Sequence, residues 1–124
     1  MAAAVFVHLI VTLAHGAAHA GAGVPMPPVA SVFVLAVVLA IPLAGLALTR
    51  LAERPGAWIV GLALGGSLVF GVVNHFVLDS ADHVARVATG WRPLFATTAV
   101  LLSITEAAGA LLAIGVIVGG RRTS

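Results

Sequence analysis

The sequence predicts an all-α protein that crosses a membrane four times as a single four-helix bundle. Hydrophobic residues make up 61% of its 124 residues and charged residues only 8%, whereas soluble domains carry about 25% charged residues. A chain with so few charges cannot cover a water-facing surface. Its apolar stretches of about 20 residues are each long enough to cross a hydrocarbon core roughly 30 Å thick. We therefore expect one integral membrane domain over residues 1–124, in contact with the lipid bilayer.

The predicted spans follow one another with a turn after each of the first three. The first covers residues 2–22 and leads into a Gly- and Pro-rich turn that ends at Pro28. The second covers 29–48 and contains Pro42, which predicts a kink. A short charged turn leads to the third span at 57–78. A longer polar connection then leads to the fourth span at 94–118.

The first span has a second interpretation. Its end, Ala18-His19-Ala20, resembles the small-residue cleavage site of a signal peptide. Cleavage there would leave three spans and remove His8, His15 and His19. A signal peptide begins with a basic segment and has an uninterrupted apolar run. This chain has neither feature at its start, which favours a retained span.

The arginines predict the orientation of the spans. The side of the chain termini carries Arg50, Arg54, Arg121 and Arg122, and the opposite side carries Arg86 and Arg92. The positive-inside rule therefore places both termini in the cytoplasm. The pI of 11.3 reflects a shortage of acidic residues, so it gives no support for nucleic-acid binding. A composition rich in Ala, Val, Gly and Arg without Lys indicates a high-GC genome. We expect a bacterial, multi-pass protein of a prokaryotic inner or plasma membrane.

Two pairs of metal-ligand residues lie near the outer ends of the first and third spans. His15 and His19 are four residues apart, as are His75 and Asp79, so each pair shares one helix face. Each pair is followed by an outer turn and a proline. This similarity predicts two parallel-repeat helical hairpins, related by an axis along the membrane normal. Because ionisable groups avoid lipid, we expect the two pairs to meet inside the bundle.

These residue types indicate a transition metal ion. Imidazole and carboxylate ligands suit Zn, Fe or Cu, and the absence of Cys excludes a thiolate site. The candidate ligands are His15, His19, His75, Asp79 and His83. The first four complete one site, and His83 together with Glu106 would allow a second ion. The sequence therefore predicts a metal-binding pocket near the outer leaflet.

A metal centre in such apolar surroundings predicts a metal-dependent enzyme. Its ion would activate water or an oxygen species for reaction with a lipid-soluble substrate. Asp82 and Glu106 are the candidate catalytic residues, as groups for proton transfer. Glu106 and His8 both lie about 18–21 Å from the outer face, at 1.5 Å per residue, which is close to the bilayer midplane. We expect these two side chains to pair with each other.

Other interpretations stay open at this point. Haem held between His15 and His75 would make the chain an electron-transfer or accessory subunit. A small metal-ion or proton transporter would use His8 and Glu106. The polar side chains could also serve only to join the helices, since hydrogen bonds between membrane helices contribute about 0.6 kcal/mol on average. A bundle of only four helices in 124 residues further predicts a homo-oligomer or a place in a larger membrane complex.

Overall fold

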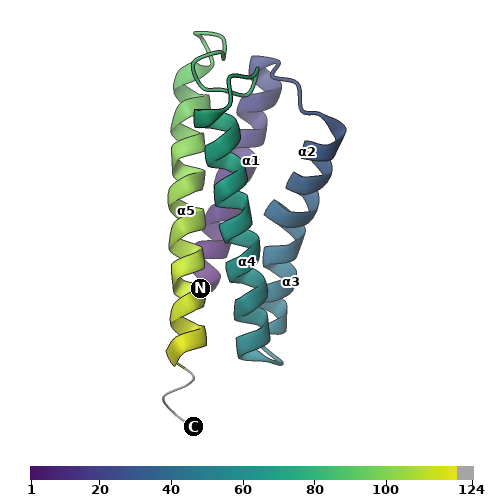
Figure 1. Ribbon diagram of the computed structural model, residues 1–124, viewed down its shortest axis with the longest axis vertical. Helices are drawn as coiled ribbons and strands as arrows, with labels where there is room; N and C mark the ends of the chain where they lie inside the picture. Colours follow the sequence, from purple (N-terminus) through teal and green to yellow (C-terminus); the bar gives the residue numbers. More distant parts are fainter. Residues whose placement is uncertain (120–124) are drawn as a thin grey trace.

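Within residues 1–119 the protein folds into four long helical rods, which lie side by side (Figure 1). The computed structural model describes residues 1–119, so Arg121 and Arg122 of the orientation argument lie outside the described residues. Each rod is long and apolar enough to cross a membrane. The all-α fold with four apolar helices is thereby confirmed. The orientation of the termini and the hairpin repeat stay predictions.

The rods are close to the predicted spans. The first is α1 (Ala2–Ala22), and the second runs through α2 (Pro28–Phe33), the π-helix η1 (Val34–Ala40) and α3 (Ile41–Leu48). The third comprises α4 (Glu53–Val72) and the π-helix η2 (Val73–Val77), and the fourth is α5 (Arg92–Gly119). The third rod begins at Glu53 instead of residue 57, and the fourth at Arg92 instead of residue 94. Sequence hydropathy misses these first turns because Glu53, Arg54 and Arg92 are charged.

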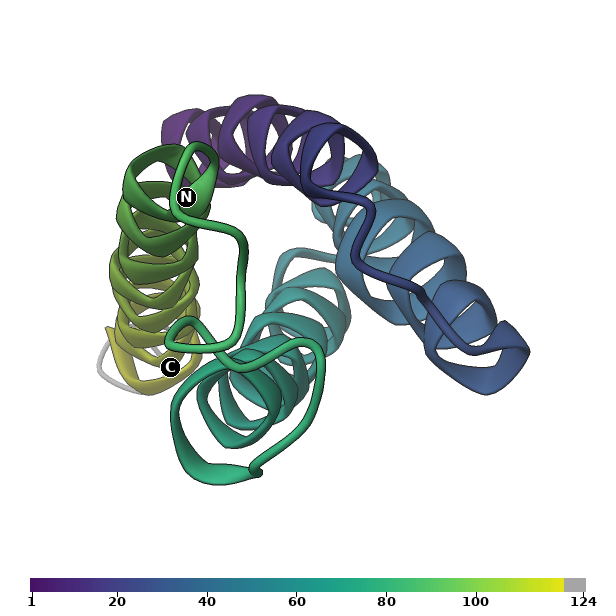
Figure 2. The ribbon, with the colours of Figure 1, turned by 90° about the horizontal axis from the view of Figure 1, so that it is seen from above.

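The rods do not pack equally tightly. α5 packs against α1 and α4, and α3 packs against α4. A small apolar core joins α1, α4 and α5, and it contains Val5, Val60, Leu64 and Ala113. By contrast, α2 makes its main contacts with η1 alone and has no buried residue. Both views show α2 standing apart from α4 at the end of the bundle that carries the 78–91 loop (Figure 2). We call this end the loop end.

The 78–91 segment forms a loop of turns that is anchored on the rods. Val87 is buried against Ala18 of α1 and Phe95 of α5. The N–H of Val84 donates to the His75 carbonyl at 3.0 Å. The preceding π-helix ends because Leu78 has an extended backbone, with φ −76° and ψ 129°. The chain therefore leaves the helix axis one residue before Asp79.

Pro42 leaves a carbonyl without its usual helical donor, and His8 supplies a replacement. Proline has no N–H, so it cannot donate to the Val38 carbonyl four residues earlier. That carbonyl accepts a hydrogen bond from Nε2 of the fully buried His8 at 3.0 Å. Irregular backbone hydrogen bonding is usual in a helix next to proline, and the π-helix η1 ends two residues before Pro42. His8 therefore joins α1 to the second rod.

Replacing His8 with alanine is expected to destabilise the bundle by about 1–3 kcal/mol, because the Val38 carbonyl is left buried without a donor. Pro42→Ala restores an N–H in the helix, so the same His8→Ala change should cost less in that background. The measurement is a double-mutant cycle on the unfolding free energy of the whole chain in detergent micelles. Purely additive losses would contradict this role of His8.

Candidate metal centre

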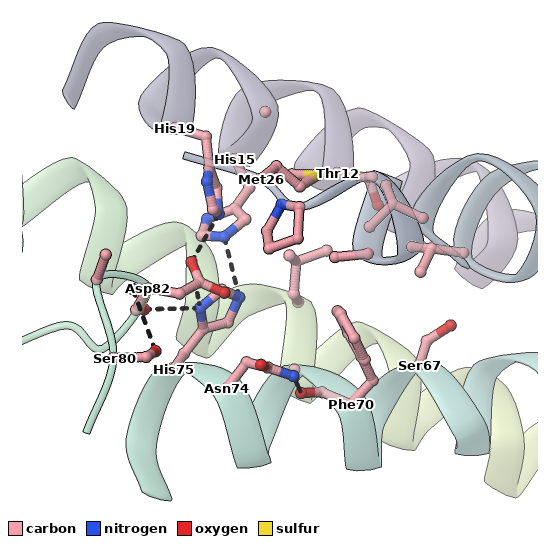
Figure 3. Close-up of a pocket in the computed structure, with 18 of the residues that line it drawn as sticks. Thr12, His15, His19, Met26, Ser67, Phe70, Asn74, His75, Ser80 and Asp82 are labelled. Carbon is pink, nitrogen blue, oxygen red and sulfur yellow. Dashed lines mark hydrogen bonds and ion pairs between the residues drawn. The ribbon is translucent and has the colours of Figure 1, made fainter. Parts of the chain in front are cut away.

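Three histidines from two rods meet at the loop end of the bundle (Figure 3). His15 and His19 lie on successive turns of α1, and His75 lies in η2. One ring nitrogen of each histidine lies within 4.8 Å of the others, and all three side chains are buried. The i,i+4 pair on α1 therefore points at the third rod. These three residues are the three-histidine cluster.

The loop fixes the protonation of His75. Its Nδ1 lies 3.2 Å from the backbone carbonyl oxygen of Asp82. A carbonyl only accepts, so Nδ1 carries the proton and donates it to this bond. In a neutral imidazole the lone pair is then on Nε2. The His75 ring thus presents an acceptor nitrogen to the interior of the cluster.

Thr98 on α5 acts on His15 in the same way. Nδ1 of His15 lies 2.8 Å from the Thr98 hydroxyl oxygen. That hydroxyl has one proton and donates it to the Leu94 carbonyl, also at 2.8 Å. It therefore accepts from His15 Nδ1, which leaves the lone pair of a neutral His15 on Nε2. Hydrogen bonds of this kind hold metal-binding histidines in the required tautomer.

The two acceptor nitrogens face each other. Nε2 of His15 lies 3.2 Å from Nε2 of His75, and two lone pairs at that distance repel unless a cation lies between them. For metal–nitrogen bonds of about 2.0–2.1 Å, two ligands of one tetrahedral ion are about 3.3–3.4 Å apart. Two axial histidines of one haem iron would be about 4 Å apart, with the porphyrin between them. The observed spacing fits a small ion better than haem.

His19 completes the cluster with a carboxylate behind it. Its Nε2 lies 3.1 Å from Oδ1 of Asp82, and the same oxygen lies 3.3 Å from Nδ1 of His75. Nδ1 of His19 is buried and has no hydrogen-bond partner among residues 1–119. This orphaned nitrogen is therefore available to an ion. The Asp82 carboxylate contacts two of the three imidazoles on their other nitrogens, as in carboxylate–histidine–metal triads.

The charge of Asp82 suits an orienting role. Burial alone would raise the pKa of its carboxyl, but the close contacts with the imidazoles of His19 and His75 outweigh burial and hold the pKa below its usual range. Asp82 is therefore ionised at neutral pH. An ionised carboxylate accepts imidazole N–H bonds and makes the opposite ring nitrogen a better ligand.

The other two candidate ligands from the sequence lie elsewhere. Both carboxylate oxygens of Asp79 accept hydrogen bonds from Arg86 at 2.7 Å, on exposed side chains. This pairing with Arg86 lowers the pKa of Asp79. His83 lies in the loop, where its Nδ1 accepts from the Ala85 N–H at 3.1 Å. Within residues 1–119, neither belongs to the group of three histidines that could hold an ion.

A cavity of about 340 Å³ adjoins the cluster. Its loop end is lined by His15, His19, His75 and Asp82, and its deeper part by Leu102 and Glu106. Glu106 is buried, and its Oε1 lies 4.0 Å from Nδ1 of His8. The two side chains are thus neighbours, but His8 Nδ1 forms no hydrogen bond among residues 1–119, so the expected pairing stays a prediction. Glu106 and the three-histidine cluster therefore line the same cavity, and His8 lies behind Glu106.

Thr98→Val is expected to weaken binding of Zn²⁺ about tenfold, because it removes the acceptor for His15 Nδ1 while keeping the side-chain shape. Thr97→Val is the matched control, since Thr97 is the exposed neighbour on the same helix. Zinc affinity would be measured by competition with a chromophoric chelator. Equal affinities for the two variants would contradict the role of Thr98.

Sequence reasoning missed two contributions to this site. The predicted site residues do not include Thr98, although it is a polar residue in an apolar span, less than two turns from the start of α5. Asp82 was assigned to proton transfer, and its contact with two imidazoles was not foreseen. The fold-back of the 78–91 loop produces this contact. Turn-rich sequence in that loop gave no signal of the direction in which Asp82 would point.

Comparisons with known proteins give no further assignment. No protein-family model matches the chain, and no curated protein or solved structure is significantly similar to it. The geometry of the site is therefore the basis for assigning a function to the chain.

Proposed function

We propose that this chain is a small membrane metalloprotein that binds one transition metal ion at His15, His19 and His75. The observation that carries the proposal is the 3.2 Å contact between Nε2 of His15 and Nε2 of His75. Each ring is already committed to donate from Nδ1, so this contact favours a cation between the two acceptors. The orphaned Nδ1 of His19 supports a third ligand.

The site resembles a catalytic centre more closely than a structural one. Structural zinc sites are closed by four protein ligands, whereas catalytic sites combine three protein ligands with an open position. Three histidines beside a cavity follow the second pattern. The separation of Asp79 and His83 from the cluster favours one ion over two. Zn, Fe and Cu all accept imidazole ligands, so the ligand set is compatible with each of them.

We infer that the chain acts as a metal-dependent enzyme on a lipid-soluble substrate at the outer leaflet of a prokaryotic plasma membrane. The ion would supply Lewis-acid activation of water or an oxygen species. Asp82 orients His19 and His75. Glu106 faces the same cavity and is the group for proton transfer, with His8 as its neighbour. The apolar walls would bind the body of the substrate.

Haem binding and transport receive less support. The two closest imidazoles leave no space for a porphyrin between them, as described above. For transport, a polar route through the bundle would be needed, but among residues 1–119 the buried ionisable side chains extend from the cluster only to His8 and Glu106. This one-sided distribution favours a site that opens from one face of the membrane.

Metal content and an absorption spectrum, recorded on one sample of the purified whole chain, test the proposal. We expect about one equivalent of transition metal per chain and no Soret band. A Soret band with stoichiometric iron would establish the haem alternative. Metal-dependent flux in liposomes that is lost in Glu106→Gln would instead establish transport.

A further inference from the structure

The cavity beside the three-histidine cluster has polar groups at both ends and apolar walls between them. The loop end carries the imidazoles, and the deeper end carries Glu106. Val34, Val38, Phe70 and Leu102 line the space between. Pockets that bind small organic molecules have this character, with volumes of about 300–1,000 Å³. At about 340 Å³ the cavity suits a molecule the size of one ring with a short tail.

Glu106 presents an unused acceptor to this cavity. The side chain is 4% exposed, and Oε2 has no hydrogen-bond partner among the described residues. His8 offers it no donor, because the His8 proton is on Nε2, where it bonds to Val38. A buried acceptor without a donor is costly. A ligand with a hydrogen-bond donor would therefore gain a bond that the protein leaves unmade.

One small molecule can reach both ends. Oε2 of Glu106 and Cδ2 of His75 each lie 3.9 Å from the position that a Cβ atom on Gly71 would occupy. Gly71 has no side chain, so the space between the carboxyl group and the imidazole stays open. A ligand bonded to Glu106 would therefore lie beside the histidine cluster.

The cavity is also open at the loop end of the bundle. Pro25, Met26, Pro27 and Ala30 line its outer part, and the first three are exposed. The first three belong to the turn before α2 and Ala30 belongs to α2, which stands apart from α4 (Figure 2). The rods meet again where the rings of Phe33 and Phe70 stack at 4.4 Å. The opening therefore lies at the loop end, beside the first turns of α2, an apolar helix with no buried residue.

We propose that the cavity binds a neutral, lipid-soluble alcohol or phenol, which enters sideways between α2 and η2 and donates its hydroxyl hydrogen to Glu106. As a statement about the substrate of an enzyme, this rests on the proposed metal centre. As a statement about binding, it depends only on the cavity and Glu106. The two proposals can therefore fail separately.

Matched probes test the hydroxyl requirement. 4-Butylphenol and 4-butylanisole differ in the donor, and their binding to the whole chain in nanodiscs would be measured by calorimetry, with and without Zn²⁺. The phenol is expected to bind about tenfold more tightly, which corresponds to one hydrogen bond in an apolar site. Glu106→Leu should abolish the difference. Glu106→Gln should keep it, because the amide oxygen still accepts.

The sideways entrance has its own pair of variants. Ala30→Phe fills the opening, and Val32→Phe adds the same ring to the lipid-exposed side of α2. The first is expected to weaken binding of the phenol at least about tenfold and the second less than about twofold. Equal losses of phenol affinity in the two variants would contradict entry between α2 and η2.

The hydroxyl requirement is overturned if the wild-type chain binds both probes equally or binds neither, or if Glu106→Leu keeps the preference. If the chain binds no metal but still prefers the phenol, the inference about the cavity holds and the proposed metal-dependent enzyme is wrong. If the chain binds one metal ion but shows no preference for the phenol, the metal centre holds and the inference about the cavity is wrong.

Discussion

Replacing His15 or His75 with alanine is expected to lower the affinity for Zn²⁺ by at least about a hundredfold. Each change removes one of the two imidazoles whose Nε2 atoms face each other at 3.2 Å. Only two histidine ligands then remain, and two metal–nitrogen bonds do not compensate for the water molecules that the ion loses on binding. Equilibrium competition with a chelator, on the whole chain in detergent, measures the loss.

His83→Ala is the matched control for these variants. His83 lies in the 78–91 loop and accepts a backbone N–H instead of joining the cluster. Its replacement should change the zinc affinity less than about twofold. A full loss of binding in His83→Ala, with binding retained in His15→Ala, would move the metal site into the loop and contradict the assignment.

Asp82→Asn is expected to weaken zinc binding about 10–100-fold, even though Asp82 is not assigned as a ligand. The carboxylate contacts His19 and His75 at 3.1 and 3.3 Å and holds both rings by their other nitrogens. An amide of the same shape carries no charge, so it polarises the imidazoles less. The expected loss of zinc affinity is therefore smaller than the loss caused by removing a histidine ligand, but larger than the loss caused by neutralising an exposed charge.

Asp79→Asn separates this role from a general effect of negative charge. Asp79 was a predicted ligand, but it forms an exposed pair with Arg86. Its replacement should leave the zinc affinity unchanged within about twofold. If Asp79→Asn weakened binding more than Asp82→Asn, the sequence-based ligand set would be correct and the orienting role of Asp82 would be wrong.

The sequence predicts the rods well and the loop poorly, for physical reasons. Apolar runs of membrane length have few alternatives to a helix, because lipid cannot satisfy exposed backbone groups. Because α1 is a helix of this kind, the i,i+4 spacing of His15 and His19 places both side chains on one helix face, as predicted. His75 and Asp79 do not share a helix face, since Leu78 is extended and the helix ends before Asp79.

The contacts that complete the site depend on tertiary structure. Asp82 reaches the cluster because the loop folds back, with the Val84 N–H bound to the His75 carbonyl and Val87 buried against α1 and α5. Thr98 reaches His15 because α5 packs against α1. Neither contact is encoded in a local pattern. The role of His8 is partly predictable from the sequence, because Pro42 has no N–H and leaves the Val38 carbonyl without its usual helical donor.

X-ray absorption at the zinc edge, recorded on the whole chain loaded with one equivalent of Zn²⁺, tests the metal centre most directly. Imidazole ligands give a distinctive outer-shell scattering pattern, and zinc–nitrogen bonds are about 2.0–2.1 Å long. We expect three imidazoles per ion and an additional oxygen ligand, and fewer imidazoles in His15→Ala, His19→Ala and His75→Ala. Coordination by oxygen alone, or a spectrum unchanged in those variants, would contradict the three-histidine site.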